Sequence, residues 1–136
     1  MKYKYLKHTA DAKFMAFGSD IEEVFANSAL AMSNILGETT KVKGVKEHKI
    51  KLKARNHERL LFDFLEELVF LLDTENFFLH KVKKIKISKT FVLEAVVVGD
   101  NSKNYDLKSD IKAVTYSDMK IEKTKKGYEA TVVVDI

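Results

Sequence analysis

The chain has 136 residues, of which 46% are hydrophobic and 32% charged, and its net charge is +4. This length and composition predict a single globular domain over residues 1–136 and exclude a disordered chain, while the absence of cysteine excludes disulfides and thiolate metal sites. Because no apolar run is long enough to span a membrane and no signal-peptide core follows Met1, we expect a cytoplasmic protein with no membrane partner.

The first part of the chain predicts two strands and a helix. Strands are expected at 2–7 and 12–17, with the polar turn His8-Thr9-Ala10-Asp11 between them. Ser19-Asp20-Ile21-Glu22 fits a capping box, in which the Ser19 and Glu22 side chains satisfy main-chain amides at a helix start. Apolar residues then recur at helical spacing up to Gly37, which stands where a C-terminal cap belongs: Ile21, Val24, Phe25, Ala29, Met32, Ile35 and Leu36.

A half-buried strand is predicted at 45–54, where apolar residues alternate with lysines. Asn56 can cap a second helix at about 57–73, whose broad apolar face includes Leu60, Leu61, Phe64, Leu65, Leu68, Leu71 and Leu72, widened by Phe62, Val69 and Phe70. The helix is expected to end at Asp73-Thr74-Glu75. Acidic groups at a helix C-terminus interact unfavourably with the helix dipole. Their presence there indicates either a functional site or simply a solvated turn that leaves the helix.

From residue 77 onward the pattern predicts strands only, at about 79–88, 90–99, 111–117, 118–124 and 128–135. Turns are expected at Ser88-Lys89, at Gly99-Asp100-Asn101-Ser102 and at Lys125-Lys126-Gly127, with a polar loop over 100–110. The order of elements predicts one α+β domain, a mostly antiparallel β-sheet with two amphipathic helices packed on it.

The two ends of the chain carry candidate metal ligands. The last apolar run, 132–134, leads into Asp135 and Ile136. If the fold brings the ends together, Asp11, Asp135 and the main-chain oxygens of Ile136 form an oxygen-rich pocket that suits a hard divalent cation. Two simpler interpretations remain open: Asp11 belongs to a tight turn that hydrogen-bonds nearby amides, and Asp135 is a solvated residue.

Lysines form the other conspicuous pattern. Lys112 lies among apolar strand residues, where it either engages a phosphate or an acidic partner or extends its charge from a sheet edge. Two further runs of lysines fit outward strand faces, at positions 41, 43, 46, 49, 51 and 53 and at 81, 83, 84 and 86. Solvation explains them most simply. The alternative, a stand-alone RNA-binding module, is weakened because no aromatic residues lie between the lysines.

No complete catalytic motif is visible. The chain has no phosphate-binding glycine loop, no serine nucleophile elbow and no paired histidine motif, so we predict that it is not an enzyme and assign no catalytic residue. A metal-dependent phosphoesterase built on Asp11 and Asp135 remains an alternative, with only His8 or Asp73 available as a general base.

Taken together, the motifs resemble the archease family, small proteins that assist the RtcB-type RNA ligase. The resemblance spans essentially the whole chain and is carried by His8-Thr9-Ala10-Asp11, Glu22-Glu23-Val24-Phe25, Leu60-Leu61-Phe62, Leu71-Leu72-Asp73-Thr74-Glu75-Asn76-Phe77, Lys112-Ala113-Val114-Thr115-Tyr116 and Val133-Val134-Asp135-Ile136. One departure is Ser117, which stands where the family often has a histidine after the Thr-Tyr pair, and it removes an acid–base group there.

The resemblance implies an activator that promotes guanylylation of the RtcB-type ligase and its multiple turnover in tRNA splicing and RNA ligation, with a broadened use of nucleoside triphosphates. RNA would then be reached only indirectly, through the ligase. The family's metal site carries over to Asp11, Asp135 and Ile136, with calcium as the expected divalent metal. The residues expected to contact the partner or act in activation are His8, Asp11, Asp73 and Lys112.

Overall fold

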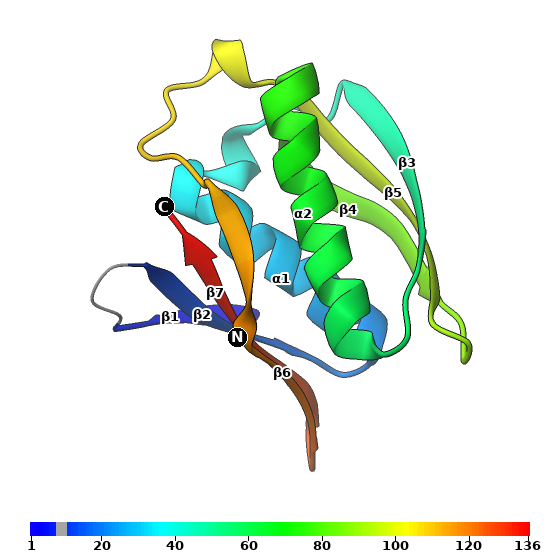
Figure 1. The fold of residues 1–136 in the computed structure, drawn as a ribbon. Coiled ribbons are helices and arrows are strands. Elements are labelled where there is room, and N and C mark those ends of the chain that lie inside the picture. Colours follow the sequence, from blue (N-terminus) through cyan, green and yellow to red (C-terminus); the bar gives the residue numbers. More distant parts are fainter. Residues whose placement is uncertain (8–10) are drawn as a thin grey trace.

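The structure is a computed structural model that describes residues 1–7 and 11–136, so His8, Thr9 and Ala10 lie outside the described residues. Along the described chain, the elements are β1 (Tyr3–Leu6), β2 (Ala12–Gly18), α1 (Ile21–Leu36), a 3-10 turn (Thr39–Lys41), β3 (Lys46–Lys53), α2 (His57–Glu75), β4 (Phe77–Ile87), β5 (Val92–Asn101), a 3-10 turn (Ser102–Asn104), β6 (Ala113–Thr124) and β7 (Gly127–Asp135) (Figure 1). No helix in the described part of the chain combines the length and apolar character needed to cross a membrane.

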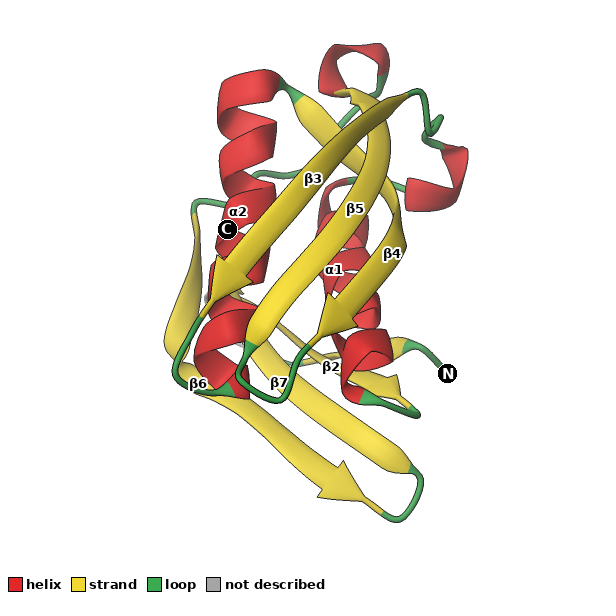
Figure 2. Cartoon of the chain, turned by 90° about the vertical axis from the view of Figure 1, so that its right-hand side faces the viewer, coloured by secondary structure: helices red, strands yellow, loops and turns green. Residues whose placement is uncertain are grey.

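The strands form two antiparallel sheets, and the two helices lie between them. The first sheet has the order β1-β2-β7-β6 and the second the order β3-β5-β4. Helix α1 contacts β2 and β7 of the first sheet and β4 of the second, whereas α2 contacts β6 on one side and β3 and β4 on the other (Figures 1 and 2). The prediction of one α+β domain with two packed helices is confirmed. The strands form two sheets, however, and not the one sheet that was predicted. Helices with such broad apolar faces bury them against two surfaces.

The core fills the space between the layers. Its largest fully buried side chains come from both helices and both sheets, namely Phe14, Phe25, Phe64, Phe77, Leu60, Leu61, Leu65 and Leu93. Phe25 of α1 and Phe64 of α2 meet with ring centroids 6.2 Å apart. The helix pair is therefore held by side chains that contact each other as well as the sheets.

Helix α1 begins one residue later than the predicted capping box implies. Asp20 is the N-cap, and its Oδ1 accepts a hydrogen bond from Glu23 N at 2.8 Å. Glu23 Oε1 accepts one from Ser19 N, also at 2.8 Å. Glu22, the predicted partner in the box, instead accepts from Ile87 N at 3.2 Å and links α1 to the end of β4. The capping pair is therefore Asp20 and Glu23 rather than Ser19 and Glu22, and Glu23 accepts from the residue before the N-cap instead of from the N-cap itself.

Helix α2 begins as predicted and ends later than predicted. Asn56 Oδ1 caps it by accepting from Arg59 N at 2.8 Å. The helix continues to Glu75 and stops at Asn76, whose φ of 53° is left-handed. Asp73 therefore lies in the last helical turn and not in an exit turn. The predicted apolar face also included Phe70, but this residue is 56% exposed and does not belong to the buried face.

Two strand predictions also change. The predicted turn at Gly99 belongs to β5, because the β4–β5 ladder continues as far as the pair Phe77↔Asn101. The strands predicted at 111–117 and 118–124 form the single strand β6, in which the pairing with β7 shifts between Thr115 and Lys120. Such an irregularity bends a strand. Tyr116 lies within it and packs on Phe62 of α2, with ring centroids 5.5 Å apart.

Replacing Tyr105 with phenylalanine tests how the loop after β5 is fixed. The Tyr105 hydroxyl donates to Asp100 Oδ2 at 2.7 Å and accepts from Lys43 N at 2.9 Å. Its hydrogen bond, together with that from Asn101 N, lowers the pKa of the Asp100 carboxyl below the ordinary 3.8. A lowered pKa in the folded state stabilises the protein above the ordinary value, and this contribution is lost as pH falls through the folded-state value.

The Tyr105→Phe variant should therefore melt at a lower temperature than the wild type at pH 7. The difference between the two melting temperatures should shrink as the pH is lowered below 4. A protonated Asp100 carboxyl is a weaker acceptor for the Tyr105 hydroxyl than the charged carboxylate is. Thermal unfolding of both proteins at a series of pH values measures this. A difference that stays constant from pH 7 to pH 3 would show that the Asp100 contact does not stabilise the fold.

Candidate functional site

The two ends of the chain meet at one end of strand β7. This strand lies between β2 and β6, and its last pairs are Ala12↔Val134 with β2 and Ala113↔Asp135 with β6. Asp11 directly precedes β2, so the antiparallel pairing places it beside Asp135. The backbone register therefore brings the two residues to the same end of the sheet.

Lys112 lies on the other side of Asp135. Its main-chain N–H donates to the carbonyl oxygen of Asp135 at 2.8 Å, one residue beyond the last β6–β7 pair. The residue is exposed. Asp11, Lys112 and Asp135 therefore come from three segments that are distant in sequence, and their main chains lie side by side at the end of the first sheet. We call this group the Asp–Lys corner.

The other predicted residues are placed differently. Ile136 directly follows Asp135 and is 40% exposed, so its main-chain oxygens belong to the same corner. Asp73 lies on another element, in the exposed last turn of α2 (Figure 1). His8 lies outside the described residues.

One further oxygen was not singled out by the sequence. Val132 and Val134 belong to the core, whereas Asp135 and Val133 point to the opposite face of the sheet. Thr115 is paired with Val133 and shares that outer face with Asp135. Its hydroxyl oxygen is buried and has no hydrogen-bond partner among the residues that the structure describes. Only the β6–β7 register reveals Thr115, because its own sequence context is that of an ordinary strand residue.

The donors at the corner match a hard cation in chemical type. They are the carboxylates of Asp11 and Asp135, the main-chain oxygens of Ile136 and the hydroxyl of Thr115, and all of them are oxygens, which Ca²⁺ and Mg²⁺ prefer. Across the described ranges 1–7 and 11–136, no group of three or more histidine, aspartate or glutamate side chains suited to a metal ion is found. A metal at this corner therefore needs main-chain or hydroxyl oxygens beside the two carboxylates.

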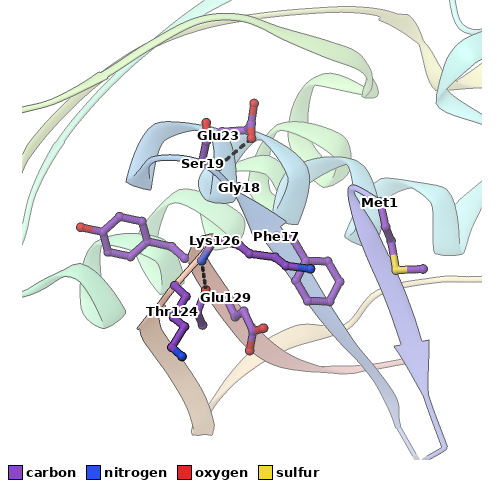
Figure 3. A pocket seen from close by; sticks show the side chains of 10 residues that line it. Met1, Phe17, Gly18, Ser19, Glu23, Thr124, Lys126 and Glu129 are labelled. Atoms are coloured by element: carbon purple, nitrogen blue, oxygen red, sulfur yellow. Dashed lines mark hydrogen bonds between the residues drawn. The ribbon is translucent and has the colours of Figure 1, made fainter.

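A separate pocket of about 700 Å³ lies at the opposite end of the β2–β7 ladder. Figure 3 shows Phe17 and Gly18 of β2 on one side, with Lys126 and Glu129 of the β6–β7 hairpin on the other. Two hydrogen bonds support its rim, Ser19 N to Glu23 Oε1 and Lys126 N to Thr124 Oγ1. Among the described residues, its lining includes none of Asp11, Asp73, Lys112, Asp135 and Ile136. The pocket and the Asp–Lys corner are therefore distinct places.

Comparison with known proteins gives a consistent assignment. The model of the Archease protein family matches residues 3–136. Protein archease of Methanosarcina mazei is 41% identical over 140 residues, which cover 99% of this chain and 96% of that protein. Protein archease of Methanothermobacter thermautotrophicus is 34% identical over 138 residues, with 98% of each chain covered.

The same agreement extends to a solved structure. The solution structure of protein 1598 from Methanobacterium thermoautotrophicum superimposes with a TM-score of 0.85 at 32% sequence identity, and the match covers 99% of both chains. Sequence and fold therefore agree over nearly the full length of the chain. The chain belongs to the archease family.

Proposed function

We propose that this protein is an activator of an RtcB-type RNA ligase, promoting guanylylation of the ligase and its multiple turnover in tRNA splicing and RNA ligation. In this role the chain contributes no catalytic residue of its own. It contacts the ligase and reaches the RNA substrate through it. Membership of the archease family supports the proposal, since ligase activation is the role that the resemblance implies.

The observation that carries the proposal is the meeting of the main chains of Asp11, Lys112 and Asp135 at the Asp–Lys corner. Nucleotidyl and phosphoryl transfer depend on cations placed against phosphate oxygens. The corner offers both components that handle such charges, an exposed ammonium group and carboxylates able to hold a metal ion. A partner surface that contains a nucleotide site matches this chemistry, and Asp73 and His8 are further proposed contacts.

We also propose that Asp11, Asp135 and the main-chain oxygens of Ile136 hold a divalent cation, with calcium the favoured ion. The oxygen-only donor set supports the choice, because calcium takes carboxylate and carbonyl oxygens in flexible geometry. When bound, the cation would neutralise the two neighbouring carboxylates and present a positive charge at the corner. Thr115 is a candidate for an additional neutral ligand on the same face.

Calcium should therefore stabilise the folded protein. A ligand that binds only the folded state at 100 times its dissociation constant adds about 2.7 kcal/mol to the free energy of unfolding. Thermal unfolding with CaCl₂ and with excess EDTA measures the difference, and NaCl of equal ionic strength serves as the control. Equal midpoints in CaCl₂ and EDTA at every calcium concentration would remove the calcium proposal.

The experiment that tests the activator role is multiple-turnover RNA ligation by the cognate RtcB-type ligase with GTP and Mn²⁺. The wild-type protein should raise both guanylylation and the number of ligations per ligase molecule. Lys112→Ala should lose this stimulation. Lys108→Ala is the matched control, because Lys108 is also exposed and lies in the loop leading to β6. The proposal is wrong if the wild type changes neither guanylylation nor turnover.

A further inference from the structure

The outer face of the second sheet gathers lysines from both lysine runs of the sequence. Strand β5 lies between β3 and β4, and the pairings align residues in rows across the three strands. Two of these rows are Lys49–Val96–Lys84 and Lys51–Glu94–Lys86. Figure 2 views the sheet from this side, with the helices behind it. We define the lysine face as Glu47, Lys49, Lys51 and Lys53 of β3, Lys81, Lys83, Lys84 and Lys86 of β4, and Val92, Glu94, Val96 and Val98 of β5.

The lysine face carries a larger net positive charge than the whole chain does. Its seven lysines and two glutamates give a formal charge of +5, whereas the whole chain has +4. Two of the lysines form ion pairs, Lys51 with Glu94 at 3.6 Å and Lys83 with Glu47 at 3.3 Å. Among the residues that the structure describes, the other five lysines have no ion-pair partner. The charge is therefore concentrated on one face and mostly available to a partner.

The strand geometry sets the spacing of the lysines, with two register shifts in β4, between Leu79 and Lys81 and between Val82 and Lys84. Alternate residues of a strand are about 6.7 Å apart, and β3 and β4 are separated by two strand spacings, about 9.6 Å in all. The lysines thus form two rows of exposed ammonium groups on either side of a central strip made of three valines and Glu94. A groove of about 610 Å³ runs here, lined by Lys49, Lys51, Lys84 and Lys86 among others. Such a surface is complementary to a flexible or helical polymer with regularly spaced negative charges.

The composition of the face favours a nucleic acid over a protein. It contains no arginine and no aromatic side chain, the residues that anchor protein interfaces, and lysine is depleted from such interfaces. Lysine does bind phosphates as a point charge. The lack of arginine and aromatic groups also leaves little means of reading base edges or stacking bases.

We infer that the lysine face binds the phosphodiester backbone of a nucleic acid without reading its sequence. The choice of RNA over DNA rests on the proposed function, because RNA is the substrate of the proposed partner. Direct contact with RNA goes beyond that function, in which RNA is reached only through the ligase. The face and the Asp–Lys corner belong to different sheets, so one can be altered without changing the other.

Fluorescence anisotropy with a labelled RNA hairpin tests the inference on the protein alone, at NaCl concentrations from about 50 to 200 mM. The variant replaces Lys49, Lys84 and Lys86 with glutamine. Its affinity should fall about tenfold or more at low salt, and the slope of log K against log salt should decrease by about one per lost contact. The control replaces three exposed lysines elsewhere with glutamine, Lys103, Lys123 and Lys125, and keeps the same net charge as the variant. It should bind RNA nearly as the wild type does.

The outcomes separate this inference from the proposed function. The inference fails if the wild type does not bind RNA, if both triple variants lose affinity equally, or if the lysine-face variant binds normally. It also fails if that variant loses only its association with the ligase, because the face would then serve an acidic protein. If DNA of the same sequence binds with equal affinity, the inferred contact with the phosphodiester backbone stands and the inferred preference for RNA is wrong. In an assay without RNA, the lysine-face variant should stimulate guanylylation of the ligase as well as the wild type does. If the wild type itself does not stimulate guanylylation, only the proposed function is refuted.

Discussion

Replacing Asp135 with asparagine should abolish stimulation of the ligase while leaving the fold intact. The change removes one negative charge from the Asp–Lys corner and keeps the size of the side chain. The hydrogen bond that Lys112 makes to Asp135 involves main-chain atoms only, so the β6–β7 register is retained. The free energy of unfolding without calcium should change by less than about 0.5 kcal/mol, as for most changes of partly exposed side chains.

Calcium binding gives this variant a second readout. Residues that merely support a metal ligand contribute about 10–100-fold to affinity, so loss of a ligand should weaken calcium binding by about 100-fold or more. Titration calorimetry measures the affinity, and the ligation assay measures activation. Asp11→Asn should behave in the same way, because its carboxylate is the other charged member of the proposed donor set.

Glu129→Gln is the matched control for Asp135→Asn. Glu129 lies on the same strand and shares its strand parity with Asp135, but it pairs with Phe17 near the opposite end of the ladder. It also undergoes the same loss of one negative charge. If Glu129→Gln removed stimulation as fully as Asp135→Asn, the effect would come from general charge and not from the corner. Full activity of Asp135→Asn would remove that carboxylate from the activation mechanism.

Local patterns predicted most of the elements, because helix periodicity and strand alternation depend on neighbouring residues. The caps show where local information ends. Ser19 and Asp20 are both good N-cap residues, and the sequence pattern favoured Ser19 with Glu22. Asp20 is the N-cap in the folded protein, because Glu22 accepts a hydrogen bond from the main chain of Ile87, a residue distant in sequence.

The presence of two sheets could not be read from the sequence for a related reason. Alternation predicts a strand but not its partner, and β3 pairs with β5 across the whole of α2 and β4. The same limit applies to the functional surfaces. Both lysine runs were visible, but only the pairing of β3 and β4 on either side of β5 places lysines from the two runs on one face. Asp11 and Asp135 could be predicted as a pair because their chemistry singles them out, whereas Thr115 could not.

Phe64→Ala should cause the largest loss of stability among these variants. The Phe64 ring is fully buried between the two sheets and contacts Phe25 of the other helix. Truncating a fully buried phenylalanine removes its burial and leaves a cavity, which costs about 3–5 kcal/mol. For a domain of this size the loss lowers the unfolding midpoint by roughly 10–20 °C, which thermal or urea unfolding can measure.

Phe70→Ala on the same helix distinguishes burial from helix propensity. Both substitutions replace phenylalanine with alanine in α2, so they share any gain in intrinsic helix stability. Because the Phe70 side chain is 56% exposed, its truncation should change the free energy of unfolding by less than about 0.5 kcal/mol. Similar losses for the two variants would contradict the placement of α2, since they would require Phe70 to be packed as deeply as Phe64. A large loss confined to Phe64 follows only if that face of α2 lies against both α1 and the sheets.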